Sequence, residues 1–220
     1  ANPNCSTIIM VMALKPIYDL AKIKRVIVST YQAVSGAGKE GIDELDAQVR
    51  DHSEGREMTA NILPSASAEK HYPIAFNLIP QIDVFCDNLY TKEEMKMVNE
   101  TKKIMEDYEM RITATTIRVP VYRSHSESVN IELEKEVDLG AMREALAKFP
   151  GVTVQDDPSK QEYPMPLYTS EKDDVYVGRL RRDESCEKSY NIWVVGDQIR
   201  KGAALNTLQI AETMIKNGWI

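Results

Sequence analysis

The sequence predicts an α/β (α+β) fold built on a mixed β-sheet. Short β-branched segments alternate along the chain with amphipathic helical segments, and residues 111–136 form a strand-rich centre. The 220 residues are 43% hydrophobic and 28% charged, which is typical of a soluble globular protein. A chain of this length suits one large domain, or one domain with a small appendage.

Composition also narrows the function classes. The formal net charge is −7 and no basic stretch offsets it, which argues against nucleic acid as a partner. No apolar run reaches the ~18 residues that a membrane span needs. The three cysteines, an odd and sparse count, fit a reducing cytoplasm better than a disulfide scaffold, and their spacing to histidines suggests no metal site.

The first elements can be assigned from periodicity and glycine content. Residues 6–21 have the pattern of a mostly buried helix, in which Pro16 marks a break or kink. Residues 24–31 are short and β-branched, as in a strand. The glycines of residues 35–41 predict a loop with unusual backbone angles at Gly36 and Gly38.

Two helices are predicted in the next part of the chain. A polar helix spans 41–55 and ends at its terminal glycine. After an extended segment at 73–83, residues 90–107 give the clearest helical pattern. Thr91 is a plausible N-cap and Glu94 follows three residues later, as in a capping box.

The second half is predicted to contain most of the sheet. The β-branched residues of 111–136 form strands broken near Pro120, and a helix follows at 138–151. A long polar loop at about 155–174 is expected to reach toward a partner subunit. The remaining elements are two strands and an amphipathic closing helix: residues 175–183, 190–197 and 201–218.

Cys5 stands immediately before the first apolar helical run. A helix N-terminus carries a partial positive charge and unpaired N–H groups, so a thiol held there loses its proton more easily. The same N–H groups can stabilise an oxyanion when the sulfur attacks a carbonyl. Cys5 is therefore a candidate nucleophile, and the alternative is a buried cysteine that only packs.

Four motifs decide between these interpretations of Cys5. NPNCST, TYQAVSGAG, RVPVYRSHSESV and GDQIRKGAALN occur in this order along the chain. Together they resemble the aspartate-β-semialdehyde dehydrogenase family, along essentially the whole sequence. Two alternatives remain open: an enzyme like N-acetyl-glutamyl-phosphate reductase, and a dimerisation module without catalysis.

The resemblance implies an oxidoreductase that reduces β-aspartyl phosphate with NADPH, on the route to lysine, threonine and methionine. It implies that Cys5 displaces phosphate and forms a thioacyl enzyme. Gln32 would orient the substrate and His125 would act as the acid/base residue. A histidine can carry a proton near neutral pH, although the ordinary alternative for His125 is a structural or surface role.

Binding residues are implied in the same way. Arg118 would hold the substrate carboxylate, for which its planar fork is suited; its alternative is a surface salt bridge. Glu93 and Lys96, three residues apart on one helix face, would bind the substrate amine and phosphate, or form only a solvated ion pair. The cofactor contacts implied by the resemblance are Ser35, Gly36 and Gln198.

The resemblance also implies the domain organisation. Residues 1–196 would form a catalytic and dimerisation domain like the C-terminal domain of glyceraldehyde-3-phosphate dehydrogenase, in a cytoplasmic homodimer or homotetramer. Residues 197–220 would be a closing helix that packs on an N-terminal nucleotide-binding domain. No strand–GxGxxG–helix pattern occurs in the chain. We therefore expect that domain, with most of the NADP site, to be missing from this chain, and the chain to be inactive alone.

Overall fold

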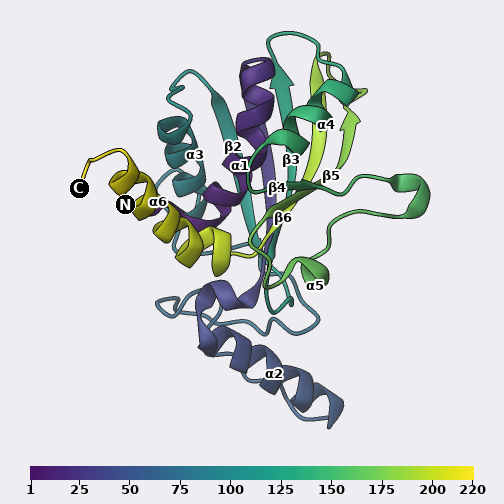
Figure 1. Cartoon of the computed structure of the whole chain (residues 1–220). Coiled ribbons are helices and arrows are strands. Elements are labelled where there is room, and N and C mark those ends of the chain that lie inside the picture. The colour runs from purple at the N-terminus through teal and green to yellow at the C-terminus, as the bar shows by residue number, and fades with distance from the viewer.

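The computed structural model describes residues 1–220 and is centred on one six-stranded sheet in the order β2-β1-β3-β6-β5-β4 (Figure 1). Strand β1 is parallel to β2, and β4 is parallel to β5. The pairs β1–β3, β3–β6 and β6–β5 are antiparallel. The predicted mixed sheet is confirmed. The strands are β1 (Ile23–Gln32), β2 (Arg111–Arg118), β3 (His125–Leu133), β4 (Val152–Val154), β5 (Val175–Arg182) and β6 (Ser189–Gly196).

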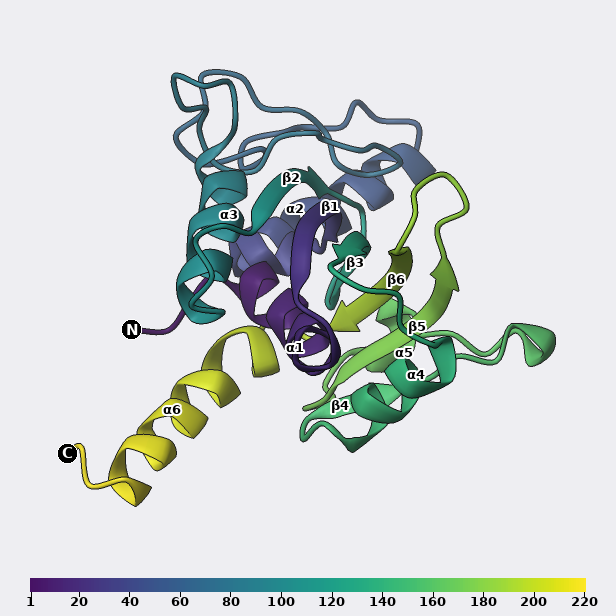
Figure 2. The same cartoon turned by 90° about the horizontal axis from the view of Figure 1, so that it is seen from above.

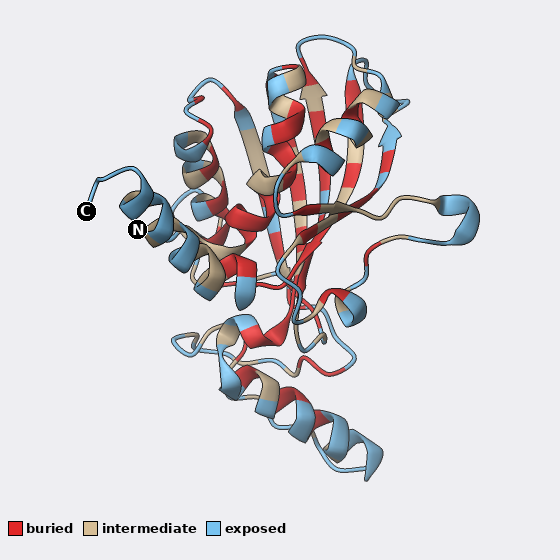
Figure 3. Cartoon of the chain, in the orientation of Figure 1, coloured by how far each residue is buried: buried red, intermediate tan, exposed pale blue.

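Helices α1, α3 and α4 cover one face of this sheet, as expected (Figure 2). Their buried side chains and those of the strands form one hydrophobic core, which Figure 3 shows concentrated along α1 and the central strands. None of the helices is long and apolar enough to span a membrane. The α-helices are α1 (Cys5–Leu20), α2 (Lys39–Ser53), α3 (Lys92–Ile104), α4 (Leu139–Lys148), α5 (Pro166–Thr169) and α6 (Leu205–Lys216).

Helix α1 is the central helix of that layer. It begins at Cys5 because Asn4 caps it: the Asn4 side chain accepts a hydrogen bond from Thr7 N. Of the break or kink predicted at Pro16, the break is wrong, because the helix continues to Leu20. Ile9, Leu14 and Pro16 itself are buried, so packing against the sheet outweighs the one backbone donor that proline removes.

Helix α3 carries the predicted capping box. Thr91 Oγ1 accepts from Glu94 N, and the Glu94 carboxylate accepts from Thr91 N. The other Glu94 oxygen accepts from Thr116 N on β2. The cap therefore also fixes α3 against the edge of the sheet.

The glycine-rich segment differs from the predicted loop. Residues Val34–Ala37 form a 3₁₀ turn, and α2 begins directly after Gly38. Gly38 has the expected positive φ of 83°. Gly36 does not have a positive φ, so the prediction of an unusual backbone angle there is wrong. Gly36 is needed for space rather than for backbone angle, as its neighbours show below.

The predicted polar loop at 155–174 contains structure that its sequence did not reveal. Strand β4 precedes it and the single turn of α5 interrupts it. Its first part extends away from the body of the molecule in both views (Figures 1 and 2). Of the two remaining cysteines, Cys86 is half-buried and Cys186 is exposed.

The predicted closing helix also starts differently. A π-helical turn, Arg200–Ala204, precedes α6, and none of the α6 residues is buried. Helix α6 leans away from the sheet layer and ends near the C-terminus (Figure 1). Apolar side chains such as Leu208 and Ile215 are exposed on it.

Candidate active site

Strand ends bring three of the predicted residues into one row on the helix-covered face of the sheet. Gln32 and Arg118 end β1 and β2 in register, and His125 begins β3 beside Gln32. All three are buried, and His125 has the same strand parity as the core residues Val129 and Ile131. The break near Pro120 places Arg118 and His125 on separate strands, which is why both face the helices.

Cys5 lies near these three residues, at the first turn of α1 on the helix-covered side of the sheet. Asn4 Nδ2, just before it, donates to Glu93 Oε1 at 2.8 Å, and Gln32 Nε2 donates to the same oxygen at 3.2 Å. Gly202 of the π-helical turn lies so close that an added Cβ would come within 3.0 Å of Cys5 Cβ. The start of α1, the sheet, α3 and the C-terminal turn therefore meet around the thiol.

The thiol is not the preformed thiolate that its helix position predicts. Burial, and to a smaller extent the nearby Glu93 carboxylate, raises the pKa of Cys5 to about 12. The Ser6 backbone and Arg118 act in the opposite direction but are weaker. Desolvation outweighs the helix N-terminus, so the resting group is a neutral thiol.

His125 is held as a neutral imidazole in one tautomer. Burial, and then the Arg118 charge, lowers its pKa well below the usual value. The Ala33 amide donates to Nδ1 at 3.1 Å, so the ring proton is on Nε2. Nε2 lies 3.4 Å from Gln32 Nε2, but both nitrogens are then donors, so this contact is not a hydrogen bond. His125 therefore presents a proton donor to the site.

Arg118 has one nitrogen that is hydrogen-bonded and another that is buried without a partner. Nη1 donates to Ala33 O at 2.8 Å, while the buried Nε has no hydrogen-bond partner. Burial lowers the Arg118 pKa, and Glu93 partly offsets this. An added Cβ on Gly36 would lie 2.7 Å from Nη1 and 3.3 Å from His125 Cε1. Gly36 thus lets the 3₁₀ turn pack directly on both side chains.

Glu93 and Lys96 lie together as their spacing predicts. Lys96 Nζ is 3.5 Å from Glu93 Oε2 and 3.3 Å from Asp83 Oδ2. Glu93 is buried and bonded to Asn4 and Gln32, so it belongs to the site, whereas Lys96 is more exposed and lies at its rim. Burial opposes the charge of Lys96, but Glu93 and Asp83 together raise its pKa.

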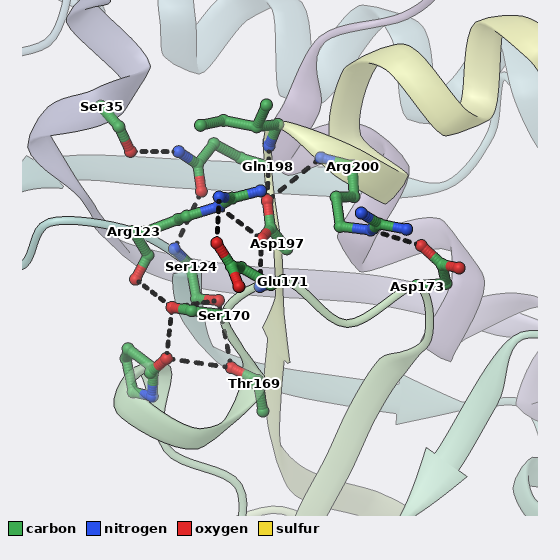
Figure 4. Close-up of polar contacts among 12 residues, drawn as sticks. Ser35, Arg123, Ser124, Thr169, Ser170, Glu171, Asp173, Asp197, Gln198 and Arg200 are labelled. Carbon is green, nitrogen blue, oxygen red and sulfur yellow. Dashed lines mark hydrogen bonds and ion pairs between the residues drawn. The ribbon is translucent and has the colours of Figure 1, made fainter. Parts of the chain in front are cut away.

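Ser35 and Gln198 contact each other. Gln198 Nε2 donates to Ser35 Oγ, and Gln198 Oε1 accepts from Ser124 N at 2.9 Å (Figure 4). Both residues are buried, beside the row and next to Gly36. The structure thus gathers every predicted site residue into one region.

Four residues of this region were not identified from the sequence. Asn4 had a readable signal, because asparagine before a helical run is a common N-cap. Glu127 also had a local signal, because alternation along the strand places it on the same buried face as Val129 and Ile131. Gly202 and Thr30, whose Oγ1 donates to Gln32 Oε1 at 3.0 Å, carry no local signal.

The arrangement combines a thiol, a proton donor and a cation with a free donor in a mostly buried site. That set is suited to acyl transfer through a cysteine, in which an anionic carbonyl oxygen and an anionic substrate must both be stabilised.

Comparisons with known proteins identify the family of this chain. The family model described as "Semialdehyde dehydrogenase, dimerisation domain" matches residues 14–201. Aspartate-semialdehyde dehydrogenase of Aquifex aeolicus (strain VF5) is 54% identical over 220 residues, which is 100% of this chain and 63% of that protein. The Bacillus subtilis (strain 168) enzyme is 51% identical over 217 residues, 98% of this chain and 63% of its own length.

A solved structure gives the same result for the fold. Aspartate semialdehyde dehydrogenase II of Vibrio cholerae, complexed with ASA, superposes with a TM-score of 0.91 at 45% identity. The match covers 98% of this chain and 62% of that one. The chain belongs to the semialdehyde dehydrogenase family and comprises its dimerisation domain.

Proposed function

We propose that the protein containing this chain reduces β-aspartyl phosphate to aspartate semialdehyde and phosphate, with NADPH as the reductant and Cys5 as the nucleophile. The chain spans 63% of the length of the curated relatives named above, so the activity is proposed for the longer protein. We expect the 220 residues alone to have little turnover.

In the first step, Cys5 Sγ bonds to the acyl carbon and the bond from that carbon to the phosphate oxygen breaks. The leaving phosphate keeps the bonding electrons and takes up the thiol proton, so no thiolate needs to exist beforehand. His125 Nε2–H donates to the carbonyl oxygen as negative charge develops there, which is the proton-donor half of an acid/base role. The product is a thioester on Cys5.

The second step returns Cys5 to its resting state. NADPH, when bound, supplies the hydride that reduces the thioester. When the C–S bond breaks and the aldehyde leaves, the sulfur takes a proton from water, because its pKa of about 12 strongly favours the thiol. A sulfur of such high pKa is a poor leaving group as a free thiolate, so this proton transfer is needed for product release.

Substrate recognition follows from the charges around the row. The unpartnered Nε of Arg118 is a donor for the substrate carboxylate. The Glu93 carboxylate suits the substrate ammonium, and Lys96 at the rim suits the phosphate. An N-acetylated glutamyl phosphate has no ammonium for buried Glu93, so this residue favours the aspartyl substrate over the alternative reductase.

The cofactor end of the site is compatible with a nicotinamide carboxamide. The Gln198 amide and Ser35 hydroxyl, which now satisfy each other, carry the donors and acceptors that a carboxamide needs. Gly36 leaves the adjacent backbone without a side chain. These three residues would hold the carboxamide, and most of the remaining NADP contacts would come from a nucleotide-binding domain.

The longer protein is proposed to be a cytoplasmic homodimer or homotetramer. The uncovered sheet face would meet the second subunit, with the extended part of 155–174 reaching toward it. Residues 1–196 would form the catalytic and dimerisation domain. Residues 197–220, including α6 with its exposed Leu208 and Ile215, would pack on the nucleotide-binding domain.

One observation carries the proposal: Asn4, Gln32 and Glu93 link the helix that starts at Cys5 to the row of Arg118 and His125. The test is an assay of the full-length gene product containing this chain, with aspartate semialdehyde, phosphate and NADP. We expect turnover that Cys5→Ser abolishes and that Arg118→Met weakens through KM. Absence of turnover in the unmodified protein, or full activity of Cys5→Ser, would contradict the proposal.

A further inference from the structure

Asp197 is a completely buried carboxylate at the junction between β6 and the C-terminal helical segment. Its Oδ1 accepts from Ile199 N at 2.9 Å and from Arg200 N at 3.1 Å, the first amides of the turn that leads into α6. Its Oδ2 accepts from Glu171 N at 2.6 Å. One side chain thus joins the start of the C-terminal helical segment to the loop that follows α5 (Figure 4).

The cation opposite Asp197 is Arg123, two residues before His125. Arg123 Nε lies 2.6 Å from Asp197 Oδ2, a close charge contact whose geometry is not that of a well-aligned hydrogen bond. Arg123 Nη1 also lies 3.3 Å from Glu171 Oε1, but that carboxylate is 77% exposed and contributes little. Asp197 is therefore the main partner of Arg123.

Ser124 connects Arg123 to His125 in a constrained backbone conformation. Its φ is +71°, in the left-handed region that serine rarely adopts, and the residue is fully buried. Ser124 N donates to Gln198 Oε1 at 2.9 Å, and Thr169 Oγ1 donates to Ser124 Oγ at 3.1 Å. Both anchors come from the segments that Asp197 holds, as Figure 4 shows.

These contacts form a short path from the C-terminal helical segment to the imidazole. The Asp197 carboxylate fixes the first turn of that segment, Arg123 binds the carboxylate, and His125 follows Arg123 after one constrained residue. The imidazole in turn accepts from Ala33 N, which sets its tautomer. A shift of Arg123 would displace the ring from that amide.

We propose that Arg123 and Asp197 form a positioning pair that transmits the placement of the start of the C-terminal helical segment to the imidazole of His125. Neither residue touches the reacting atoms. The pair holds the Nε2 donor where the carbonyl oxygen develops charge, and a displacement of about 1 Å at such a position can cost up to about a hundredfold in rate. The kinetic part of this inference rests on the proposed function; the placement of the ring does not.

The test compares Arg123→Met, Arg123→Lys and a control, Asp173→Asn, in the full-length gene product. Asp173 pairs with Arg200 Nε at 2.5 Å in the same region, but both side chains are about half exposed. We expect R123M to lower kcat about tenfold, with KM changed less than about threefold, R123K to restore most of kcat, and D173N to match the unmodified protein. Rates are normalised to the concentration of folded protein, measured by size-exclusion chromatography and circular dichroism, which removes any effect of misfolded protein.

The position of the ring is read separately by ¹⁵N NMR of labelled histidines, of which the chain has three. R123M should move the Nδ1 resonance of His125, because the bond from Ala33 N is strained or lost, while D173N should not. If R123M does not fold, D197N replaces it, because its amide oxygen can still cap the turn before α6. An unchanged His125 resonance, or R123M and D173N with equal kcat, would overturn the inference.

The two proposals can fail separately. An inactive unmodified protein that still shows the R123M-specific shift of His125 would refute the proposed function and retain the positioning pair. Cys5-dependent turnover unaffected by R123M would do the opposite.

Discussion

Asn4 Nδ2 donates to Glu93 Oε1 at 2.8 Å, which joins the residue before Cys5 to a helix that begins 88 positions later (92 − 4). The same Asn4 caps α1 through its Oδ1, and its backbone N–H donates to Glu100 Oε2 at 2.7 Å. One asparagine therefore sets both the start of the Cys5 helix and its position against α3.

The two roles of Asn4 can be separated by substitution. Asn4→Ala should lower the free energy of unfolding by about 1 kcal/mol through loss of the cap. Asn4→Ser keeps an oxygen that can cap Thr7 but is too short to reach Glu93, so it should lose less than half as much. Urea denaturation checks both, and an Asn4→Ala variant as stable as the unmodified protein would contradict the assignment.

Gly36 and Gly38 should respond differently to alanine. In Gly36→Ala the new Cβ would approach Arg118 Nη1 to 2.7 Å and push the guanidinium from its place, so we expect KM for aspartate semialdehyde to rise about tenfold, or about 1.4 kcal/mol of binding. Gly38 has open space around it but a φ of 83° and a ψ of −170°. Gly38→Ala should therefore cost about 1–3 kcal/mol of stability with KM unchanged.

Steady-state kinetics and thermal denaturation distinguish the two glycine variants. The account would be wrong if Gly36→Ala left KM unaltered, or if Gly38→Ala changed KM as much as Gly36→Ala did.

Glu127 should make stability depend on pH. Glu127 lies on β3 two residues after His125, opposite Thr30 of β1. It is fully buried, and neither of its carboxylate oxygens has a hydrogen-bond partner. Burial raises its pKa well above the usual value. Above the unfolded pKa of ~4.3 the folded chain holds a proton that the unfolded chain has released, so this residue contributes less stability as pH rises toward its folded pKa.

Glu127→Gln is nearly isosteric and removes that titration. Its stability should be close to that of the unmodified protein near pH ~4 and exceed it increasingly toward neutral pH. Urea denaturation across this range is the measurement. A constant difference between the two proteins at every pH would show that Glu127 does not titrate in this way.

The Cys5 thiol should behave as a weak acid in the resting protein. With a pKa of about 12, its alkylation rate should keep rising with pH well past the ~8.5 of a free cysteine, without a plateau there. Glu93→Gln removes a neighbouring negative charge and should increase the rate at a fixed pH. Stopped-time labelling with iodoacetamide followed by mass spectrometry of the Cys5 peptide gives both results, and a plateau near neutral pH would disprove the neutral thiol.

The sequence predicted the fold where local signals were strong. The Thr91 capping box and the β-branched strands on either side of Pro120 are local features, and the structure confirms them. Strand β4 and helix α5 are three and four residues long, too short for periodicity to show. The continuity of α1 through Pro16 depends on tertiary packing, which no window of sequence contains.

The site residues were predicted from the motif resemblance and not from physical arguments about single residues. Motif resemblance selected the residues that the structure brings together, but the helix-terminus argument gave the wrong protonation state for Cys5. That argument counts the N–H groups of α1, whereas burial and Glu93 come from elements distant in the sequence. The pairing of Arg123 with Asp197 is likewise invisible in the sequence, because it joins positions 74 residues apart (197 − 123).

The central claim is that Cys5 carries the acyl group. The most direct measurement is intact-mass and peptide mass spectrometry of the full-length gene product after brief mixing with β-aspartyl phosphate in the absence of NADPH and acid quenching. The account predicts an added aspartyl group on the Cys5 peptide that is released by hydroxylamine and absent in Cys5→Ser. Acylation of another residue, or turnover with no adduct at Cys5, would contradict it.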